Sequence, residues 1–407
     1  MGNTLLTNDI IAKLILMEFK NNLVLAKTCN RHYENVFSTE TGTNIRVRRP
    51  TRLVSAQGAT LVTQDIQERY TNLTINNRQH VGIQLSSQEL SLQLDDFQAH
   101  VIRPAMQSLA NQVDSSIYNS GVANIYNFVG TAGTAPNAFN TVNLAKAKLN
   151  AFGVPSTDRY CIMSENDGAS LQSALYNTFN QDFNKKIILD SSMGRLAGFE
   201  FYTAQNVVRP NNLVGASFGS PIIGAAGQSG TSLSLTGLTA NITVKAGTLF
   251  TIAGVNSVNP ISYVDTTLLA NFVVSTDAVA DGSGNITLNI NNGTGAGSGA
   301  QGIILSGPYQ NVTNAPGASA VVTFQARHTK NLAYHTECFT LAMINLYSPP
   351  PSQNTGAYFK NLVDKDANIA LRMVRQYDIT NDVDICRVDA LWGVNCFGEY
   401  GAVIMGS

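Results

Sequence analysis

The chain has 407 residues, of which 44% are hydrophobic and 13% are charged, and its formal net charge is −1. This length and apolar content are enough for two or three compact units with hydrophobic cores. The low, balanced charge excludes a dedicated nucleic-acid binder, whose affinity depends on clustered Lys and Arg side chains, and an uncharged surface is suited to extensive protein contact.

The five cysteines are widely spaced, and no two of them form a CxxC pair. An odd number of such cysteines is typical of free thiols in a reducing compartment rather than of a disulfide framework. The cysteines therefore do not imply that the protein is exported. Their positions are 29, 161, 338, 386 and 396.

The first predicted element is an amphipathic helix over residues 8–28. Charged residues interrupt its apolar run and no small-residue cleavage site follows, so it is not read as a signal peptide. Ile11 and Leu14 belong to a wide apolar face that needs a covering partner. That partner is either the helix's own domain or a neighbouring subunit, and both alternatives stay open. Ile11 and Leu14 are candidates for contacts between subunits.

Two segments with alternating apolar and polar residues follow, at 43–54 and 73–85. This alternation predicts two strands, each with one solvated face. The polar segment between them is too long for a tight hairpin turn, so the pair is predicted to project as a long two-stranded arm. Such an arm is marginally stable alone and gains order from a surface against which it lies.

Four arginines lie at the base of this predicted arm. Guanidinium groups bind carboxylates and phosphates in a fixed geometry, so the arginines can clamp an anionic group, such as a carboxylate of a neighbouring subunit. The alternative is a solvated strand face. The four candidates for contacts between subunits are Arg46, Arg48, Arg49 and Arg52.

Residues 94–120 are predicted to form the longest helix. Pro104 is expected to kink or restart it. Apolar residues recur at intervals of four residues and form one buried stripe. The stripe consists of Phe97, Val101, Ala105, Leu109, Val113 and Ile117.

Residues 141–210 mix helix and strand signals, which predicts an α+β unit. Helices are expected at 141–155 and 168–177, and strands at 159–164 and within 194–207.

The composition changes at residues 211–325, where Gly, Ser, Thr and Asn dominate and only four residues are charged. Short alternating segments separated by turn clusters predict a small antiparallel β-barrel or sandwich, inserted into an α+β unit that resumes near residue 326. The glycine-rich run at 293–299 lacks the Lys-Ser/Thr ending of a phosphate loop and is read as a turn. The predicted strands lie at 231–235, 241–247, 248–254, 271–276, 285–290, 302–307 and 320–324.

His335, Glu337 and Cys338 lie close together in a segment, 331–343, that is predicted to be a strand. In a strand His335 and Glu337 share one face and Cys338 points to the other, so the three groups do not converge. The His-Thr-Glu triplet matches half of a zinc deaminase signature, but no P-C-x-x-C follows. No nucleophile motif is present either. We therefore predict no catalytic residue, metal site or cofactor, and no enzyme activity.

Four segments, at 194–207, 245–260, 331–346 and 375–405, together resemble the major capsid proteins of tailed bacteriophages, which have the HK97-like fold. Within this family, the chain specifically resembles the subgroup of short-tailed-phage coat proteins with an inserted β domain. The resemblance covers most of the chain from residue 90 onward, and the first 90 residues match by layout alone.

The resemblance implies an α+β HK97-like fold with an inserted antiparallel β-barrel. On this view residues 331–343 form a strand of the axial domain. Residues 384–406 return to the peripheral sheet, with Trp392 in or beside the core. The implied divisions are an N-terminal arm (1–40), an extended hairpin (41–83), a peripheral domain with the long helix (84–140 and 369–407), an axial domain (141–210 and 326–368) and the inserted domain (211–325).

The resemblance also implies a structural function. Copies would assemble into pentamers and hexamers of an icosahedral shell around double-stranded DNA, which they contact without sequence specificity. The implied partners are other capsid subunits, a scaffolding protein and a portal protein, with no membrane. The implied locations are the virion and, during assembly, the cytoplasm of the host bacterium. The alternative is a virion decoration protein or a receptor- or carbohydrate-binding protein, suggested by the polar insertion.

One departure from the family concerns covalent cross-linking. Some members join their subunits through an isopeptide bond between a lysine of the extended hairpin and an asparagine. This chain has no lysine between Lys27 and Lys146. We therefore expect a shell held together by noncovalent contacts.

Overall fold

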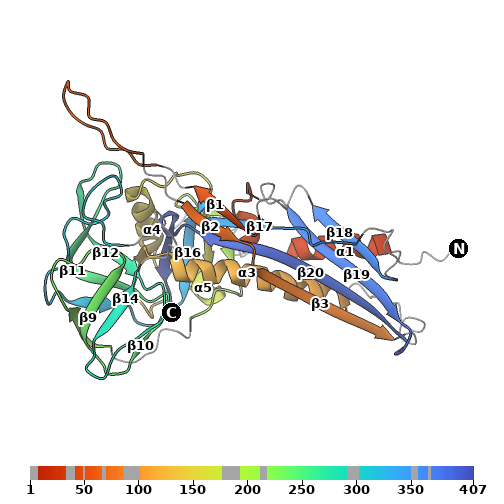
Figure 1. The fold of residues 1–407 in the computed structure, drawn as a ribbon. Coiled ribbons are helices and arrows are strands. Elements are labelled where there is room, and N and C mark those ends of the chain that lie inside the picture. The colour runs from red at the N-terminus through yellow and green to blue at the C-terminus, as the bar shows by residue number, and fades with distance from the viewer. Residues whose placement is uncertain are drawn as a thin grey trace. The chain divides into compact units, whose positions relative to one another are not determined.

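The computed structural model contains both helices and strands (Figure 1), which confirms the predicted α+β class. The chain divides into two compact units, each built from separated segments: 1–45, 73–118 and 340–395 form the first, and 46–72, 119–339 and 396–407 form the second. The structure describes residues 8–33, 42–48, 51–66, 70–86, 101–176, 193–210, 218–290, 302–349, 356–364 and 368–407.

The first unit is built on a sheet whose central strand is long. This strand, β20 (Val383–Cys396), pairs along one side with β19 and along the other with β3, and β18 lies beyond β19. A fifth strand, β17, also pairs with β20. The other strands are β3 (Asn77–Ser86), β17 (Phe339–Met343), β18 (Tyr358–Asp364) and β19 (Ile369–Asp378).

Two helices belong wholly or mainly to this unit, α1 (Asn8–Asn22) and α3 (Arg103–Asn124), together with a short turn, η1 (Leu25–Thr28). The predicted stripe of α3 is buried at Leu109, Val113 and Ile117. Trp392 is also buried, and its indole N–H donates to Ser116 Oγ of α3 at 2.8 Å. The expected place of Trp392 in the core is therefore confirmed.

Pro104 is the second residue of α3. Val101 and Ile102, directly before this α-helix, are in π-helical geometry, so the helical conformation changes from π to α next to Pro104, and the expected restart is the alternative observed. The first part of the predicted helix, 94–100, lies outside the described residues.

The predicted long arm is wrong in both strands, because residues 51–54 of the strand predicted at 43–54 form no strand and the strand predicted at 73–85 is divided. β1 (Asn44–Arg48) pairs with a separate short strand, β2 (Tyr70–Thr74). Residues 77–86 form β3 and pair with β20, from Asn77 opposite Trp392 to Ser86 opposite Val383. Alternation predicts a strand and its two faces, but it does not identify the partner strand.

The second unit contains a six-stranded sheet with the order β4, β21, β16, β5, β7, β6. Helices α4 (Phe139–Ala151) and α5 (Glu165–Tyr176) contribute Val142, Leu149 and Leu171 to its hydrophobic core. The helices predicted at 141–155 and 168–177 and the strand predicted at 159–164 are thus confirmed. The strands are β4 (Phe128–Val129), β5 (Arg159–Met163), β6 (Arg195–Leu196), β7 (Phe199–Thr203), β16 (Lys330–His335) and β21 (Gly401–Met405).

Two predicted strand assignments near the end of the chain are corrected. Residues 331–343 are not one strand, because the turn η4 (Thr336–Cys338) separates β16 from β17, and these two strands belong to different sheets. Residues 384–406 do not all return to one sheet. The turn η5 (Gly398–Tyr400) follows β20, and β21 then lies between β4 and β16 of the six-stranded sheet.

Residues 218–324 contain the predicted β-rich segment. Two three-stranded sheets, ordered β14, β9, β8 and β12, β11, β15, are linked by a bridge between Ile222 and Val321. The side chains between them form one hydrophobic cluster. The strands are β8 (Gly219–Ile223), β9 (Ser232–Leu238), β10 (Thr243–Val244), β11 (Leu249–Val258), β12 (Asp265–Val273), β13 (Ala278–Val279), β14 (Ile286–Asn289) and β15 (Val322–Phe324).

The strand predicted at 302–307 is wrong, because only a single bridge forms there, between Ile303 and Gly230. The residues of the glycine-rich run at 293–299 lie outside the described part of the chain.

A buried lysine connects the β-rich segment to the rest of the second unit. Lys330 is the first residue of β16, and its ammonium group donates to the carbonyl oxygens of Val122 at 2.9 Å and Gly247 at 2.5 Å. Val122 lies in the last turn of α3, and Gly247 lies between β10 and β11. Burial lowers the pKa of Lys330 to about 7. Because a neutral amine retains two N–H donors, both hydrogen bonds can persist after deprotonation.

Replacing this lysine by methionine is expected to destabilise the subunit by about 2–4 kcal/mol, because two buried carbonyl groups lose their donor. The pKa of Lys330, about 7, is below the unfolded value of 10.5, so the unfolded chain binds more protons between these pH values. Wild-type stability should therefore gain a contribution as pH rises above 7, and Lys330→Met should lack it. Urea denaturation at several pH values measures both effects.

The matched control is Lys245→Met, which removes a surface lysine paired with Asp277 at 2.7 Å. It should change the free energy of unfolding little. Parallel pH dependences for wild type and Lys330→Met would contradict the account of the buried amine.

Candidate subunit-contact surfaces

The base of the arm has the alternation that the sequence predicts. In β1, Ile45 and Val47 are buried, whereas Arg46 and Arg48 are exposed. The two short strands are continued by a hydrogen bond from Ile75 N to Thr43 O at 3.0 Å. The strand faces therefore present two of the candidate arginines to solvent.

Two of the candidate arginines have partners inside the second unit. The Arg46 guanidinium lies 4.6 Å from the ring centroid of Tyr70, a cation–π contact. Arg52 is 3.3 Å from the Glu399 carboxylate and 5.9 Å from the ring centroid of Tyr309. Arg52 therefore already has an anionic partner in its own chain.

Arg48 and Arg49 are the other two candidates at the arm base. Arg48 is exposed on β1, and Arg49 lies outside the described residues. A four-arginine clamp thus stays a prediction.

The distal arm, residues 51–66, is an extended segment without helix or strand that projects beyond β1 and β2 (Figure 1). Its two runs are joined by one side chain. The Gln64 amide oxygen accepts the backbone N–H of Val54 at 2.9 Å, and the Gln64 amide nitrogen donates to the Val54 carbonyl. This pair of bonds closes the tip of the arm into a loop.

Large apolar side chains of the distal arm are exposed in the isolated chain. Exposed fractions reach 85% at Leu61 and 69% at Ile66. Burying one such side chain contributes about 1.5–3 kcal/mol of stabilisation. A surface that covered the arm would therefore be strongly favoured. The exposed set is Leu53, Leu61, Val62 and Ile66.

Sequence reasoning did not predict these exposed apolar residues. The segment between the two predicted strands is treated there as polar. The signal was present in the stretch TLVTQDIQ, residues 60–67, where Leu61, Val62 and Ile66 stand among polar residues. Residues 51–66 form no strand, and exposed apolar residues of this kind in an extended arm are candidates for contact with another molecule.

The N-terminal helix has its apolar face covered by its own subunit. α1 lies against β18 and β19, and its Ile15 and Phe19 side chains are fully buried. Ile11 is 8% exposed, whereas Leu14 keeps part of its side chain accessible. Of the two alternatives left open by the sequence, docking on the helix's own domain is the one observed in the single chain.

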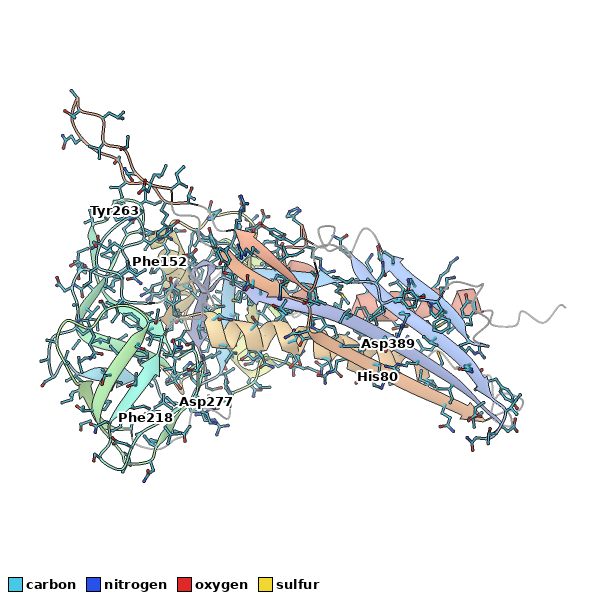
Figure 2. The ribbon with its side chains drawn as sticks, viewed as in Figure 1. His80, Phe152, Phe218, Tyr263, Asp277 and Asp389 are labelled. Carbon is cyan, nitrogen blue, oxygen red and sulfur yellow. The ribbon has the colours of Figure 1, made fainter. Side chains whose placement is uncertain are left out.

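A charged network lies on the sheet of the first unit. The buried Asp389 carboxylate of β20 accepts from Arg372 at 2.6 Å and from Arg387 at 2.8 Å, and Arg78 lies 3.8 Å away. His80 of β3 stands opposite Asp389 in the strand register (Figure 2). The network holds β3, β20 and β19 together, because each contributes at least one of the charged groups.

The cluster of His335, Glu337 and Cys338 does not form a reactive site. His335 Nδ1 accepts the backbone N–H of Glu337 at 3.2 Å and so caps the turn η4. Burial lowers the pKa of His335, although the Glu337 and Asp158 carboxylates oppose this shift. Glu337 is exposed while Cys338 is buried, so the groups diverge. Across the described ranges of the chain, no three His, Cys, Asp or Glu side chains are grouped to hold a metal ion.

The sequence matches the family described as P22 coat protein, gene protein 5, over residues 2–188 and 228–403. The chain belongs to this family. It is therefore a major capsid protein of a tailed phage and forms the phage shell. The family and the α+β architecture confirm the predicted HK97-like capsid fold. The search of the curated proteins gave no match.

Several solved structures are similar to this capsid protein at low identity. A chain from Mycobacterium phage Che8 has 11% identity and a TM-score of 0.49, with 94% of this chain and 90% of that chain covered. The capsid of the cyanophage P-SCSP1u has 9% identity and a TM-score of 0.47, with 95% of this chain and 88% of that chain covered. The mature capsid of bacteriophage PhiM1 has 10% identity and a TM-score of 0.43, with 90% of this chain and 82% of that chain covered.

The family assignment decides between the two predicted functions. It favours the shell-forming capsid protein over the decoration or receptor-binding protein, and it places the protein in the virion. It also assigns the chain a structural role in the capsid. No helix within the described segments has the length and apolar character required to span a membrane.

Proposed function

We propose that copies of this capsid protein associate head to tail in rings of five and six, and that the rings close into an icosahedral shell around double-stranded DNA. The single observation that carries this proposal is the distal arm, whose exposed Leu61 and Ile66 side chains need a covering surface. Head-to-tail contacts close into rings only at certain rotation angles, so one surface must tolerate two slightly different angles. An extended arm can do so because it can bend without disturbing a core.

The proposed contact residues divide into two groups. Leu61 and Ile66 of the distal arm would bury apolar area against a neighbouring subunit. Arg46, Arg48 and Arg49 at the arm base would meet carboxylates of that neighbour, a role that the exposed positions of Arg46 and Arg48 support. Arg52, which pairs with Glu399, would fix the arm base instead. Leu14 is a lesser candidate on α1, where Ile11 would act by holding the helix in place.

The insertion is proposed to be a separate domain, residues 211–325, that stabilises the subunit and touches neighbours. Its own hydrophobic cluster supports the first part of this proposal. The Lys330 bond to Gly247 also supports it, and so does the bond from Asn271 Nδ2 to Phe128 O at 3.2 Å. The remaining divisions proposed from the sequence are an arm, an extended hairpin, a peripheral domain and an axial domain.

The proposed partners are a separate scaffolding protein, a portal protein and the packaged DNA, which would be contacted without sequence specificity. Assembly would take place in the cytoplasm of the host bacterium. No covalent cross-link is proposed, because the arm has no lysine that could form an isopeptide bond.

These proposals can be tested by expressing the chain alone and together with the scaffolding protein encoded by the same phage. Negative-stain microscopy should find closed shells only in the second sample. Shells boiled in SDS should give a single band at 43.6 kDa. A small, soluble oligomer in both samples would contradict the shell proposal, and a ladder of bands above the monomer would contradict noncovalent assembly.

A further inference from the structure

Two thiols of the second unit lie almost in contact. Cys338 Sγ and Cys396 Sγ are 3.9 Å apart, and the residues are 58 positions apart in the sequence. Cys338 ends the turn η4, and Cys396 ends β20. A backbone hydrogen bond from Phe397 N to Cys338 O, at 2.7 Å, holds the two segments together beside the sulfur atoms.

Two other cysteines, Cys161 and Cys386, lie where burial favours the protonated thiol. Burial raises the pKa of Cys386 to about 11, and burial also holds the pKa of Cys161 well above its usual range. A thiol whose pKa is raised in this way is protonated at neutral pH and reacts slowly, because the thiolate is the nucleophile. Within the described part of the chain, Cys161 and Cys386 have no second sulfur atom in contact, unlike Cys338 and Cys396.

We propose that Cys338 and Cys396 form a disulfide within the subunit once the particle leaves the reducing host cytoplasm. A capsid protein folds where thiols are kept reduced and then persists outside the cell, where disulfides are stable. The two sulfur atoms are in van der Waals contact at 3.9 Å and need to approach to about 2.05 Å to form the bond. The site is a modification site, and its reagent is a small disulfide such as oxidised glutathione.

The chemistry is two successive thiol–disulfide exchanges. Cys396 is 6% exposed and Cys338 is fully buried, so Cys396 reacts first. Its thiolate attacks one sulfur of the small disulfide and releases one small thiolate. The Cys338 thiolate then attacks the Cys396 sulfur of the mixed disulfide and releases the second. The two cysteines lose two protons and two electrons, and the small disulfide is reduced to two thiols.

The topology explains what this bond would do. Residues 340–395 belong to the first unit, whereas Cys338 and Cys396 belong to the second. The disulfide would therefore close a loop that contains residues 340–395. Its two cysteines lie next to the points where the chain leaves the second unit and returns to it. Closing a long loop restricts the unfolded chain and so stabilises the folded one.

Purified shells should be incubated with oxidised glutathione or with dithiothreitol, denatured, and alkylated. The reduced sample should carry five alkylated cysteines, and the oxidised one should carry three and a peptide pair linked through Cys338 and Cys396. The oxidised subunit should also melt higher by roughly 5 °C. Assembly is not required for the bond, so free subunits should give the same count. The chemistry is thus tested separately from shell formation.

Two variants sharpen the test. Cys396→Ser should retain all four remaining thiols under oxidation, whereas Cys386→Ser, which removes a buried thiol elsewhere, should still lose two. If a serine variant does not fold, the wild-type count alone decides the matter. Five alkylated cysteines after oxidation, a linkage between other cysteines, or disulfide-linked dimers would overturn the proposal.

Discussion

The double substitution Leu61→Asp with Ile66→Asp is expected to abolish shell assembly while leaving the free energy of unfolding of the isolated subunit unchanged. Both side chains are largely exposed in the single chain, so the subunit loses no internal packing. In a shell, each apolar side chain would contribute about 1.5–3 kcal/mol, and each aspartate would add the cost of desolvating a charge. Both the lost apolar burial and the added desolvation cost would apply to every subunit of the shell.

Sedimentation velocity with the scaffolding protein present measures assembly, and urea denaturation of the free subunit measures stability. The matched control is Leu61→Met with Ile66→Val, which keeps both positions apolar and should assemble nearly as wild type. Shells formed by the aspartate variant at the wild-type yield would show that the distal arm has no contact role.

Phe250→Ala is expected to destabilise the subunit by about 3–5 kcal/mol, because it opens a cavity in a closely packed core. Phe250 of β11 is fully buried, with its ring centroid 5.4 Å from that of Phe272 and 5.5 Å from that of Phe324. A loss of this size is a large share of the stability of a typical domain. The measurable outcome is a lower urea midpoint and more insoluble subunit during expression.

Phe218→Ala is the control for this prediction. Phe218 packs against the same cluster, 4.8 Å from the Phe324 ring, but it is only partly buried, so its loss should cost less. Equal effects of the two alanine substitutions would show that the cluster is not a cooperative core.

Deleting residues 211–325 should give insoluble or misassembled subunits, since Lys330 would lose its Gly247 acceptor as well. Normal shells from that deletion would contradict a stabilising role for the insertion.

Local patterns predicted the elements that are determined by their own sequence. The helix over 141–155 ends at Gly153, whose φ of +71° favours glycine, and the observed α4 ends just before it. The strand predicted at 159–164 contains three buried apolar residues, Cys161, Ile162 and Met163, and it lies inside the six-stranded sheet. In the same way, alternation in β1 placed Ile45 and Val47 inside and Arg46 and Arg48 outside.

Pairing over long sequence distances could not be predicted in this way. Val81 and Ile83 of β3 lie opposite Val388 and Cys386 of β20, about three hundred residues later in the chain. The two residues between β2 and β3, Ile75 and Asn76, are neither glycine nor proline. The sequence pattern therefore predicted a single strand there. In 331–343 the change of sheet depends on His335 capping the turn η4, which alternation does not show.

The candidate contact surface was predicted at its base and missed at its tip. The arginines of the arm base are a charge pattern that can be read directly from the sequence. The contribution of Leu61 and Ile66 became visible only when the structure showed that nothing in the described part of the chain covers them. The near contact of Cys338 with Cys396 likewise depends on the turns η4 and η5, which no local pattern predicted.

Hydrogen exchange of residues 51–66, compared between free subunits and assembled shells, tests most directly whether the arm is ordered by neighbouring subunits. The backbone of this segment forms no helix or strand in the single chain, so its amides should exchange rapidly in the free subunit. Assembly should slow this exchange strongly at Leu61, Val62 and Ile66. Equal, rapid exchange in both states would contradict the account.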